Sequence, residues 1–233
     1  MYRFAGLNGN EGIKNYICLG TDSCSSGSDN MYRIIGVNPT NGELKVVKET
    51  PWNNSQTYTW HNTDEEITWD KSDLYNNTVK LIYDNLAFKN IIVLNHVWGI
   101  GAMNVEDVAT RKGILSLENA STMLANVNIL SVADYYLAYN ADRNWRTSYD
   151  TTTNWIDMHQ NILSPTNDEW TMSFYGYWEN TFPSYKSWAI DYIYGGISRY
   201  GGDSKGNIRP TFYIQPIEYI SGDGSKENPF IVE

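Results

Sequence analysis

The first third of the chain alternates between short apolar runs and polar turn sequences, which is the pattern of paired β-strands. Residues 15–19 and 31–37 are rich in β-branched and aromatic side chains, and both runs are bounded by Gly, Ser, Asp and Asn. Pro and Asn-Gly turn residues then precede another apolar run at 44–48. The pattern predicts a β-hairpin over residues 31–48. The polar and aromatic residues 50–69 have no helical period and are predicted as a surface excursion.

The middle of the chain carries the helical signals. Apolar side chains recur at helical spacing over residues 72–86, and Ser72 is placed to cap the N-terminus of that helix. A strand is predicted over residues 91–101, where an apolar run ends near two glycines. Further along, a short buried strand precedes Ser131, which is placed to cap a short helix over residues 132–138.

The last third of the chain is rich in strand signals. Residues 169–176 and 187–196 alternate between two sets of side chains, as strands with two different faces do. Apolar and aromatic runs at 208–220 and 228–232 then close the chain. Strands at both ends with helices between them predict one α+β domain whose terminal strands pair.

The domain is expected to span the whole chain, residues 1–233, because no internal repeat, linker or low-complexity block divides the sequence. Residues 1–14, which precede the first predicted strand, are a candidate N-terminal extension. The sequence shows neither an export signal nor an anchor.

Composition and charge narrow the class of function. The chain carries 27 acidic and 17 basic side chains, so its formal net charge is -10. Because phosphate groups attract positive charge, this excess disfavours nucleic-acid partners and docking on anionic lipid. No run of eighteen apolar residues is present, so this chain is not expected to insert into a membrane. Charged side chains make up only 19% of the residues, and the remaining polar surface favours an extracellular or cell-surface protein.

The two cysteines, Cys18 and Cys24, are separated by five residues that include Gly20. Two interpretations compete: a local disulfide formed in an oxidising compartment, and two free thiols that lie close together. The disulfide is favoured. A metal site is disfavoured, because two ligands are too few and no histidine lies nearby.

No catalytic or metal-binding motif stands out. The histidines His61, His96 and His159 are far apart, and the sequence contains no familiar nucleophile, zinc or phosphate-loop pattern. The acidic turns at 22–29 and 221–228 do not match a calcium-binding loop. The sequence therefore predicts no metal and no cofactor.

Paired carboxylates are the remaining candidates for catalysis, because two acids can hydrolyse a glycosidic bond. The adjacent acids at 65–66 and 168–169 would point to opposite faces of an extended chain. For Glu179 and Asp191, the sequence does not exclude a catalytic arrangement of the two carboxylates. The favoured interpretation is that Glu179 and Asp191 are solvated charges beside a binding surface. The protein is therefore predicted not to be an enzyme.

The strongest functional signal is the segment over residues 173–202, which holds ten aromatic side chains in thirty positions together with many Ser and Gly residues. Tyr and Trp give a large contact area at low cost in conformational entropy, and Ser and Gly give adaptable hydrogen bonding, as in antibody paratopes. Because side chains along a strand alternate between two faces, only part of this segment can lie in the core. The predicted ligand-binding face consists of Trp178, Ser184, Tyr185, Ser187, Asp191, Tyr194, Ser198 and Tyr200.

Three segments resemble a large group of surface proteins from gut Firmicutes and their wall-less relatives. The opening NYICLGTDSC…DNMYRIIGV is similar to the group's NYVCFGS…C…DNLYRIIGV, and LSVADYYLA is similar to its MYVSDYGFA. The closing NIRPTFYIQPIEYISGDGSKENPFIV is similar to its VRPVFYLNSSVTYVSGTGTSSDPY. The resemblance covers most of residues 15–233; it is weakest in the middle and most specific in the closing block.

Proteins of that group look like C-type-lectin-like domains, with mixed antiparallel sheets, two main helices and paired N- and C-terminal strands. Some members of the wider fold group are diversified by retroelements in a variable segment, for surface display and ligand binding. The resemblance maps that segment to residues 178–203 and the closing strand to residues 208–214. The chain departs from the group's pattern over residues 161–184, a stretch that is longer than expected and contains two prolines.

The residues and the resemblance together predict a non-enzymatic, adhesin-like ligand-binding domain displayed on a bacterial surface. Its expected partner is a glycan or a protein on a host or microbial surface. The alternative is a structural, pilin-like subunit whose aromatic patch is an assembly interface. A glycoside hydrolase that uses Glu179 and Asp191 is the third hypothesis.

Overall fold

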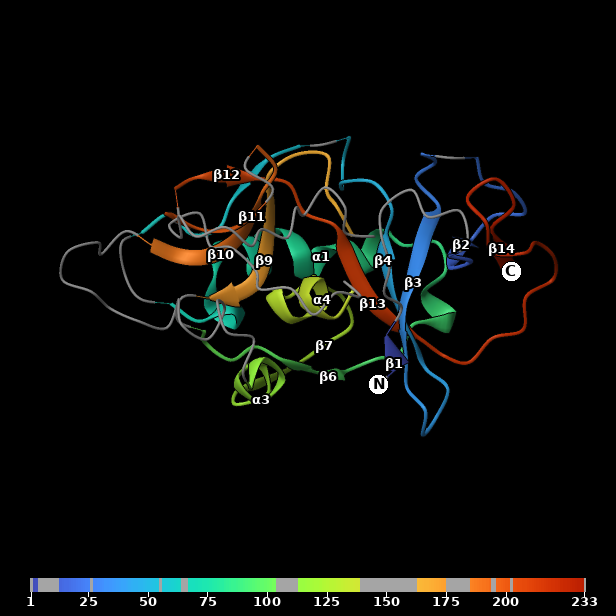
Figure 1. Ribbon diagram of the computed structural model, residues 1–233, viewed down its shortest axis with the longest axis horizontal. Helices are drawn as coiled ribbons and strands as arrows, with labels where there is room; N and C mark the ends of the chain where they lie inside the picture. Colours follow the sequence, from blue (N-terminus) through green and yellow to red (C-terminus); the bar gives the residue numbers. More distant parts are fainter. Residues whose placement is uncertain are drawn as a thin grey trace, which may run out of the picture.

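The protein combines several β-sheets with a few short helices, which confirms the α+β class (Figure 1). The computed structural model describes residues 2–3, 13–25, 27–54, 56–63, 67–103, 113–138, 163–174, 185–193, 196–201 and 203–232. Among these residues, no helix has both the length and the hydrophobicity needed to cross a membrane.

A seven-stranded sheet forms the main framework and brings the two ends of the chain together. Its strands run in the order β14-β2-β3-β4-β13-β8, and β1 pairs with β3 outside this path. β14 lies parallel to β2, and the other pairs are antiparallel. The predicted pairing of the terminal strands is therefore confirmed. The bounds are β1 Tyr2–Arg3, β2 Tyr16–Leu19, β3 Met31–Val37, β4 Leu44–Lys48, β8 Asn128–Ile129, β13 Pro210–Ile214 and β14 Phe230–Val232.

The predicted hairpin is formed by β3 and β4. Its turn is closed by two backbone hydrogen bonds, from Asn38 N to the Glu43 carbonyl at 2.8 Å and from Gly42 N to the Asn38 carbonyl at 2.8 Å. Gly42 has a φ of 74°, a left-handed conformation that glycine adopts without steric cost. The Asn-Gly signal in the sequence thus marks the turn correctly.

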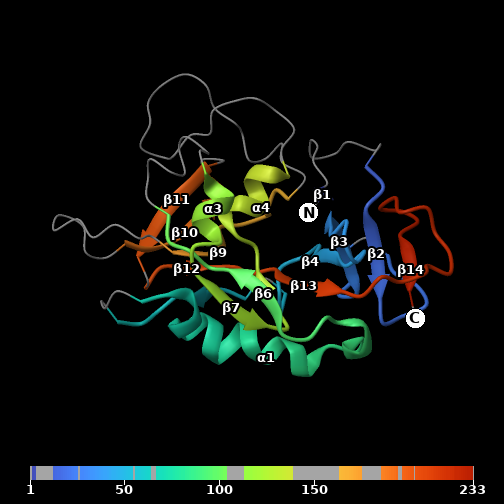
Figure 2. The same cartoon turned by 90° about the horizontal axis from the view of Figure 1, so that it is seen from below.

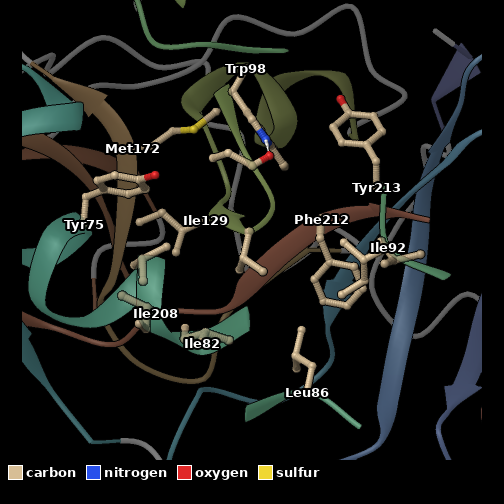
Figure 3. Close-up of a cluster of buried hydrophobic side chains, with 14 of the residues drawn as sticks. Tyr75, Ile82, Leu86, Ile92, Trp98, Ile129, Met172, Ile208, Phe212 and Tyr213 are labelled. Carbon is tan, nitrogen blue, oxygen red and sulfur yellow. Dashed lines mark hydrogen bonds between the residues drawn. The ribbon is translucent and has the colours of Figure 1, made fainter. Parts of the chain in front are cut away.

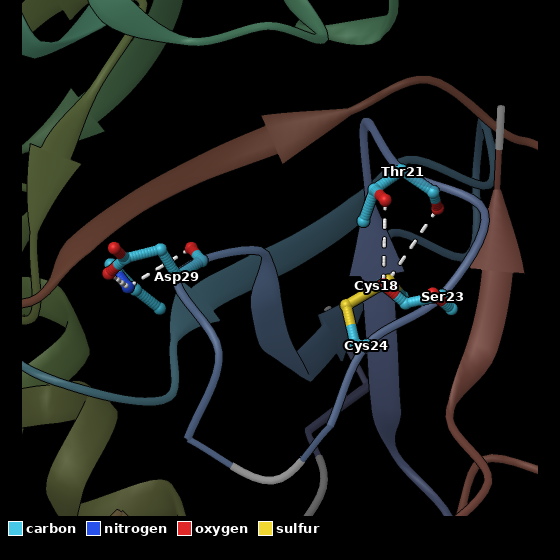
Figure 4. Close-up of a disulfide and its surroundings, with 6 residues drawn as sticks. Cys18, Thr21, Ser23, Cys24 and Asp29 are labelled. Carbon is cyan, nitrogen blue, oxygen red and sulfur yellow. Dashed lines mark hydrogen bonds and ion pairs between the residues drawn. A yellow bond between two sulfur atoms is a disulfide. The ribbon is translucent and has the colours of Figure 1, made fainter.

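The predicted disulfide joins Cys18, at the end of β2, to Cys24 (Figure 4). The two Cα atoms lie 5.8 Å apart, a separation typical of a disulfide. The bridge ties the end of β2 to the first part of the loop that leads to β3.

The helix predicted over residues 72–86 is a run of three helical segments: a π-helical turn (Tyr75–Val79), α1 (Lys80–Ile82) and a 3₁₀ turn (Tyr83–Asn85). Ser72 caps it as predicted, because its Oγ accepts a hydrogen bond from the Tyr75 N–H at 3.1 Å. In Figure 2 this helical segment runs along one side of the molecule.

The second predicted helix is α4 (Val132–Leu137), and Ser131 caps it in a reciprocal arrangement. The Asp134 N–H donates to Ser131 Oγ at 3.2 Å, and the Ser131 N–H donates to Asp134 Oδ2 at 3.0 Å. This capping box places the start of the helix directly after Ser131.

The strand predicted over residues 91–101 is shorter than expected. Only β6 (His96–Gly99) is a regular strand, and it pairs with β7 (Thr122–Ala125). The chain before β6 forms a 3₁₀ turn at Lys89–Ile91, and Asn95 adopts a left-handed φ of 51° that breaks the extended run. A short helix, α3 (Ile114–Glu118), precedes β7.

The last third of the chain forms a three-stranded antiparallel sheet in the order β11-β10-β9. A small two-stranded sheet of β12 and β5 lies next to it (Figures 1 and 2). The bounds are β5 Tyr58–Thr59, β9 Glu169–Phe174, β10 Tyr185–Asp191, β11 Gly196–Gly201 and β12 Lys205–Gly206; a 3₁₀ turn also spans Trp69–Lys71.

The three-stranded sheet lies between two hydrophobic clusters. Trp170, Met172 and Phe174 of β9 belong to the larger cluster, part of which is drawn in Figure 3. Trp188 and Ile190 of β10 belong to the smaller cluster. The sheet is therefore covered on both faces, and this arrangement decides which of its side chains reach the surface.

Candidate ligand-binding face

Of the eight residues of the predicted ligand-binding face, the structure describes four in full, and these lie together on β10 and β11. Trp178, Ser184 and Tyr194 lie outside the described residues, and only the backbone of Tyr185 is described, in β10. The other four are placed in full, and three of them differ from the prediction.

Ser187, Asp191 and Ser198 are buried, with exposed fractions of 0%, 6% and 5%. The prediction that Ser187 and Asp191 face solvent is therefore wrong, and Ser198 is likewise not exposed. The cause is that hydrophobic clusters pack against both faces of this three-stranded sheet. The Ser187 hydroxyl donates to the carbonyls of Thr171 and Ser173 at 3.2 and 3.1 Å, and Ser198 Oγ donates to Asp191 Oδ2 at 3.4 Å. These polar groups satisfy one another inside the protein.

Tyr200 is partly exposed, and its hydroxyl points toward a carboxylate at the surface. The phenol donates to Asp168 Oδ2 at 3.5 Å, and its ring packs edge-on against Trp170 with 5.9 Å between ring centroids. Burial, followed by the negative charges of Asp168 and Asp191, raises the pKa of Tyr200 above its ordinary value. The phenol therefore remains a hydrogen-bond donor at neutral pH.

A hollow of about 380 Å³ lies beside Asp168 at the turn between β10 and β11, and we call it the hairpin hollow. Only Tyr192 and Ile193 of its lining belong to the segment that the sequence singled out, and neither is one of the predicted ligand-binding residues. Tyr192 and Ile193 are exposed by 40% and 76%. The hairpin hollow is lined by Thr57, Asn167, Asp168, Tyr192, Ile193, Lys205 and Asn207.

Asp168 and Asn207 hold the walls of the hairpin hollow together. Asp168 Oδ1 accepts a hydrogen bond from the Tyr192 N–H at 2.8 Å, which fixes the turn after β10. The Asn207 N–H donates to the Asp168 carbonyl at 2.8 Å, and Asn207 Nδ2 donates to the Gln56 carbonyl at 3.0 Å. Four segments of the chain are thus joined, so the hollow is largely preorganised.

The lining of the hairpin hollow suits recognition of a polar ligand. Tyr192 and Ile193 provide apolar contact area, and Thr57, Asn167 and Lys205 provide hydrogen-bonding groups. Among the described residues of the lining, Asp168 is the one carboxylate. Of the predicted catalytic pair, Glu179 lies outside the described residues and Asp191 is buried.

The described histidines serve packing and pairing. His61 Nδ1 lies 2.9 Å from Asp73 Oδ2, and the His96 ring stacks on Tyr213 with 3.5 Å between centroids. His159 lies outside the described residues. Within the described part of the chain, no group of three or more His, Cys, Asp or Glu side chains is arranged to hold a metal ion.

A buried ionic cluster that the sequence analysis missed is centred on Glu169, the residue after Asp168. Arg209 Nε donates to Glu169 Oε2 at 2.8 Å, and the Tyr135 hydroxyl donates to Glu169 Oε1 at 2.6 Å. Arg209 also donates to the Leu163 carbonyl. Burial raises the pKa of Glu169, and the charge of Arg209 opposes that shift. Glu169 points inward while its neighbour Asp168 lines the surface hollow, which agrees with the opposite faces expected for adjacent residues of a strand.

A second buried ion pair was also missed by the sequence analysis. Lys45 Nζ donates to both carboxylate oxygens of Asp134, at 2.7 and 2.8 Å. The same ammonium lies 5.0 Å from the centre of the Trp98 ring and 5.7 Å from that of Tyr213. Two signals in the sequence could have indicated this pair. Lys45 lies within the apolar run 44–48, and Asp134 lies within the apolar residues of the helix that Ser131 caps.

The hairpin hollow is the described site whose geometry best suits ligand recognition. Its lining combines exposed apolar contact area with polar groups in set positions. A comparison of the chain with protein-family models, curated proteins and solved structures found no match.

Proposed function

We propose that the protein is a non-enzymatic, adhesin-like binding domain that recognises its ligand at the hairpin hollow. One observation carries the proposal: exposed Tyr192 and Ile193 stand at the rim of a hollow whose carboxylate, Asp168, is held by the backbone of the same turn. An aromatic side chain beside fixed hydrogen-bonding groups is the usual composition of a recognition site.

The proposal includes a C-type-lectin-like fold. It is supported by the pairing of β2 with β14, which joins the two ends of the chain, and by two helical elements, the segment around α1 and α4. The segment that the resemblance maps as variable, residues 178–203, includes Tyr192 and Ile193 and precedes β13. In this proposal that segment supplies the aromatic part of the ligand-binding face.

The proposed location is the exterior of a bacterial cell. The Cys18–Cys24 disulfide supports it, because disulfides persist in oxidising compartments and are rare in the cytosol. The proposed ligand is a glycan or a protein on a host or microbial surface.

The proposal is tested by screening the protein on glycan arrays and on bacterial and epithelial cells, and by repeating the screen with Tyr192→Ala. Tyr219→Ala is the matched control, because Tyr219 is also exposed but does not line the hairpin hollow. Binding should be lost in Tyr192→Ala and kept in Tyr219→Ala. Equal binding by both variants would remove the hairpin hollow as the site.

A structural, pilin-like subunit is the second candidate function, and one observation favours it. Val97 of β6 and Leu124 of β7 face each other across the strand pair and are exposed by 58% and 62%. Leu94 and Leu115 are exposed as well. Exposed apolar side chains in this number are typical of an assembly interface. Assembly that rises with protein concentration in light scattering, and that Leu124→Glu abolishes, would support this function over ligand binding.

A further inference from the structure

A second hollow, of about 230 Å³, lies beside the loop that follows β4. We call it the asparagine hollow, because four of the side chains that line it are those of Asn30, Asn53, Asn54 and Asn85. It shares no lining residue with the hairpin hollow. We propose that the asparagine hollow binds a neutral saccharide, which is a site beyond the one proposed above.

Charge pairing in the wall argues for a neutral ligand. The Lys48 ammonium donates to Asp29 Oδ1 at 3.0 Å, to the Asp29 carbonyl at 3.1 Å and to Thr50 Oγ1 at 3.0 Å. All three of its N–H groups are thereby used, so this cation has no remaining donor for an anionic ligand. Asp29 lies in the segment between the disulfide loop and β3 (Figure 4).

The hollow that adjoins it repeats this pattern. This larger hollow, of about 520 Å³, shares Asp29 and Asn54 with the asparagine hollow. Its two cations are matched by carboxylates: Lys226 Nζ lies 3.6 Å from Glu49 Oε1, and Arg209 pairs with Glu169. A phosphate or sulfate would have to displace one of these pairs and would also meet a chain of net charge -10.

The amide side chains have hydrogen-bonding capacity to spare. Among the described residues, the side chains of Asn30 and Asn54 make no hydrogen bond. Asn53 and Asn85 use only their Nδ2 groups, which donate to the Tyr58 hydroxyl at 3.4 Å and to the Leu81 carbonyl at 3.1 Å. Their Oδ1 atoms remain as acceptors. An amide offers a donor and an acceptor side by side, which matches two neighbouring hydroxyl groups of a sugar ring.

Trp52 supplies the apolar surface that a sugar ring also needs. Its side chain lines the asparagine hollow, is partly exposed, and packs against the main hydrophobic cluster. Its backbone N–H donates to the Ile208 carbonyl at 2.9 Å, which fixes the main chain at this residue to the chain just before β13. The C–H face of a pyranose ring is apolar, so the indole of Trp52 can pack against it.

The backbone of Asn53 and Asn54 has a defined conformation before any ligand binds. Asn53 and Asn54 have φ values of 50° and 53°, in the left-handed region that Asn tolerates better than most residues. The Gln56 N–H donates to the Asn53 carbonyl at 3.1 Å and closes the turn. A preorganised loop loses less entropy on binding, which favours recognition of a small polar ligand.

The experiment is a glycan array that carries neutral hexose- and N-acetylhexosamine-terminated saccharides beside sialylated and sulfated ones, followed by calorimetry with the best neutral saccharide. Asn54→Gly keeps the left-handed backbone while removing the amide, and Asn30→Ala removes an amide without a protein partner. Each should weaken binding of the neutral saccharide by about 10-fold or more, the loss expected for hydrogen bonds in a preorganised site.

The control is Asn77→Ala, because Asn77 is an exposed asparagine of the helical segment and lines neither hollow. It should bind like the native protein, and circular dichroism should show that all variants keep the native fold. If Asn54→Gly fails to fold, Asn30→Ala decides the question.

Three results would overturn the inference: no binding of neutral saccharides, binding confined to sialylated or sulfated ones, or native affinity in the asparagine variants. Tyr192→Ala separates this site from the hairpin hollow. Saccharide binding that is lost in Tyr192→Ala and kept in the asparagine variants would reject the asparagine hollow while leaving the proposed function intact.

Discussion

Buried ion pairs join parts of this protein that are far apart in the sequence. Arg209 and Glu169 are 40 positions apart, and Lys45 and Asp134 are 89 apart, yet each pair is buried and in direct contact. A charged residue within an apolar run can indicate a buried charge, but its partner could not be predicted, because nothing local in the sequence specifies it. The capping roles of Ser72 and Ser131 could be predicted, since the group each one binds lies three residues away.

Removing the charge of Glu169 should strongly destabilise the protein. In Glu169→Gln the Arg209 guanidinium stays buried without its counter-charge, and such losses typically cost about 3–5 kcal/mol. Urea unfolding measures the free energy of unfolding. Glu218→Gln is the control, because Glu218 is exposed and should change stability by less than about 0.5 kcal/mol. Equal stabilities of the two variants would show that the buried pair does not hold the sheets together.

Whole elements were predicted where one local pattern dominates. The hairpin of β3 and β4 and the strands β9 and β14 follow apolar runs and turn residues. α3 and β7 were not predicted, because residues 114–125 carry no clear period. The prediction that one face of β10 is exposed was wrong. The alternation of side chains identifies two faces of the strand, but it does not reveal that each face is covered by a hydrophobic cluster.

The capping box makes α4 a stability-determining element. Ser131→Ala removes the side-chain acceptor of the Asp134 N–H and should lower the free energy of unfolding by about 1 kcal/mol. Ser116→Ala is the matched control, because Ser116 is an exposed serine within α3. Chemical denaturation of both variants gives the comparison. A Ser131→Ala protein as stable as its control would mean that the cap does not determine the start of α4.

At the scale of the whole molecule, many aromatic side chains lie in the core, and Tyr192 lines the hairpin hollow. Trp60, Trp69, Trp98, Trp170 and Trp188 are all fully buried. The sequence signal of many Tyr and Trp residues therefore reports packing as much as recognition. The buried aromatic residues differ from Tyr192 in their position relative to the two hydrophobic clusters. The sequence does not specify that position.

Buried tyrosines should make the stability of the whole molecule depend on alkaline pH. Burial is the main cause that raises the pKa of Tyr32, Tyr75, Tyr135 and Tyr200 above the ordinary value of about 10. The unfolded chain then releases these protons first, so stability is complete below pH ~10 and falls as the pH rises beyond it. Melting temperatures measured from neutral to strongly alkaline pH test this. A melting temperature that stays constant above pH ~10 would contradict it.

We propose above all that the protein binds its ligand through the ring of Tyr192 at the rim of the hairpin hollow. The most direct measurement is the dissociation constant of Tyr192→Ala relative to Tyr219→Ala, for whichever ligand the screen identifies. Truncation of an aromatic anchor commonly costs about 2 kcal/mol, so we expect a ratio of about 30, and Tyr192→Phe should recover most of the affinity if the ring makes the contact. A ratio close to one would contradict the claim.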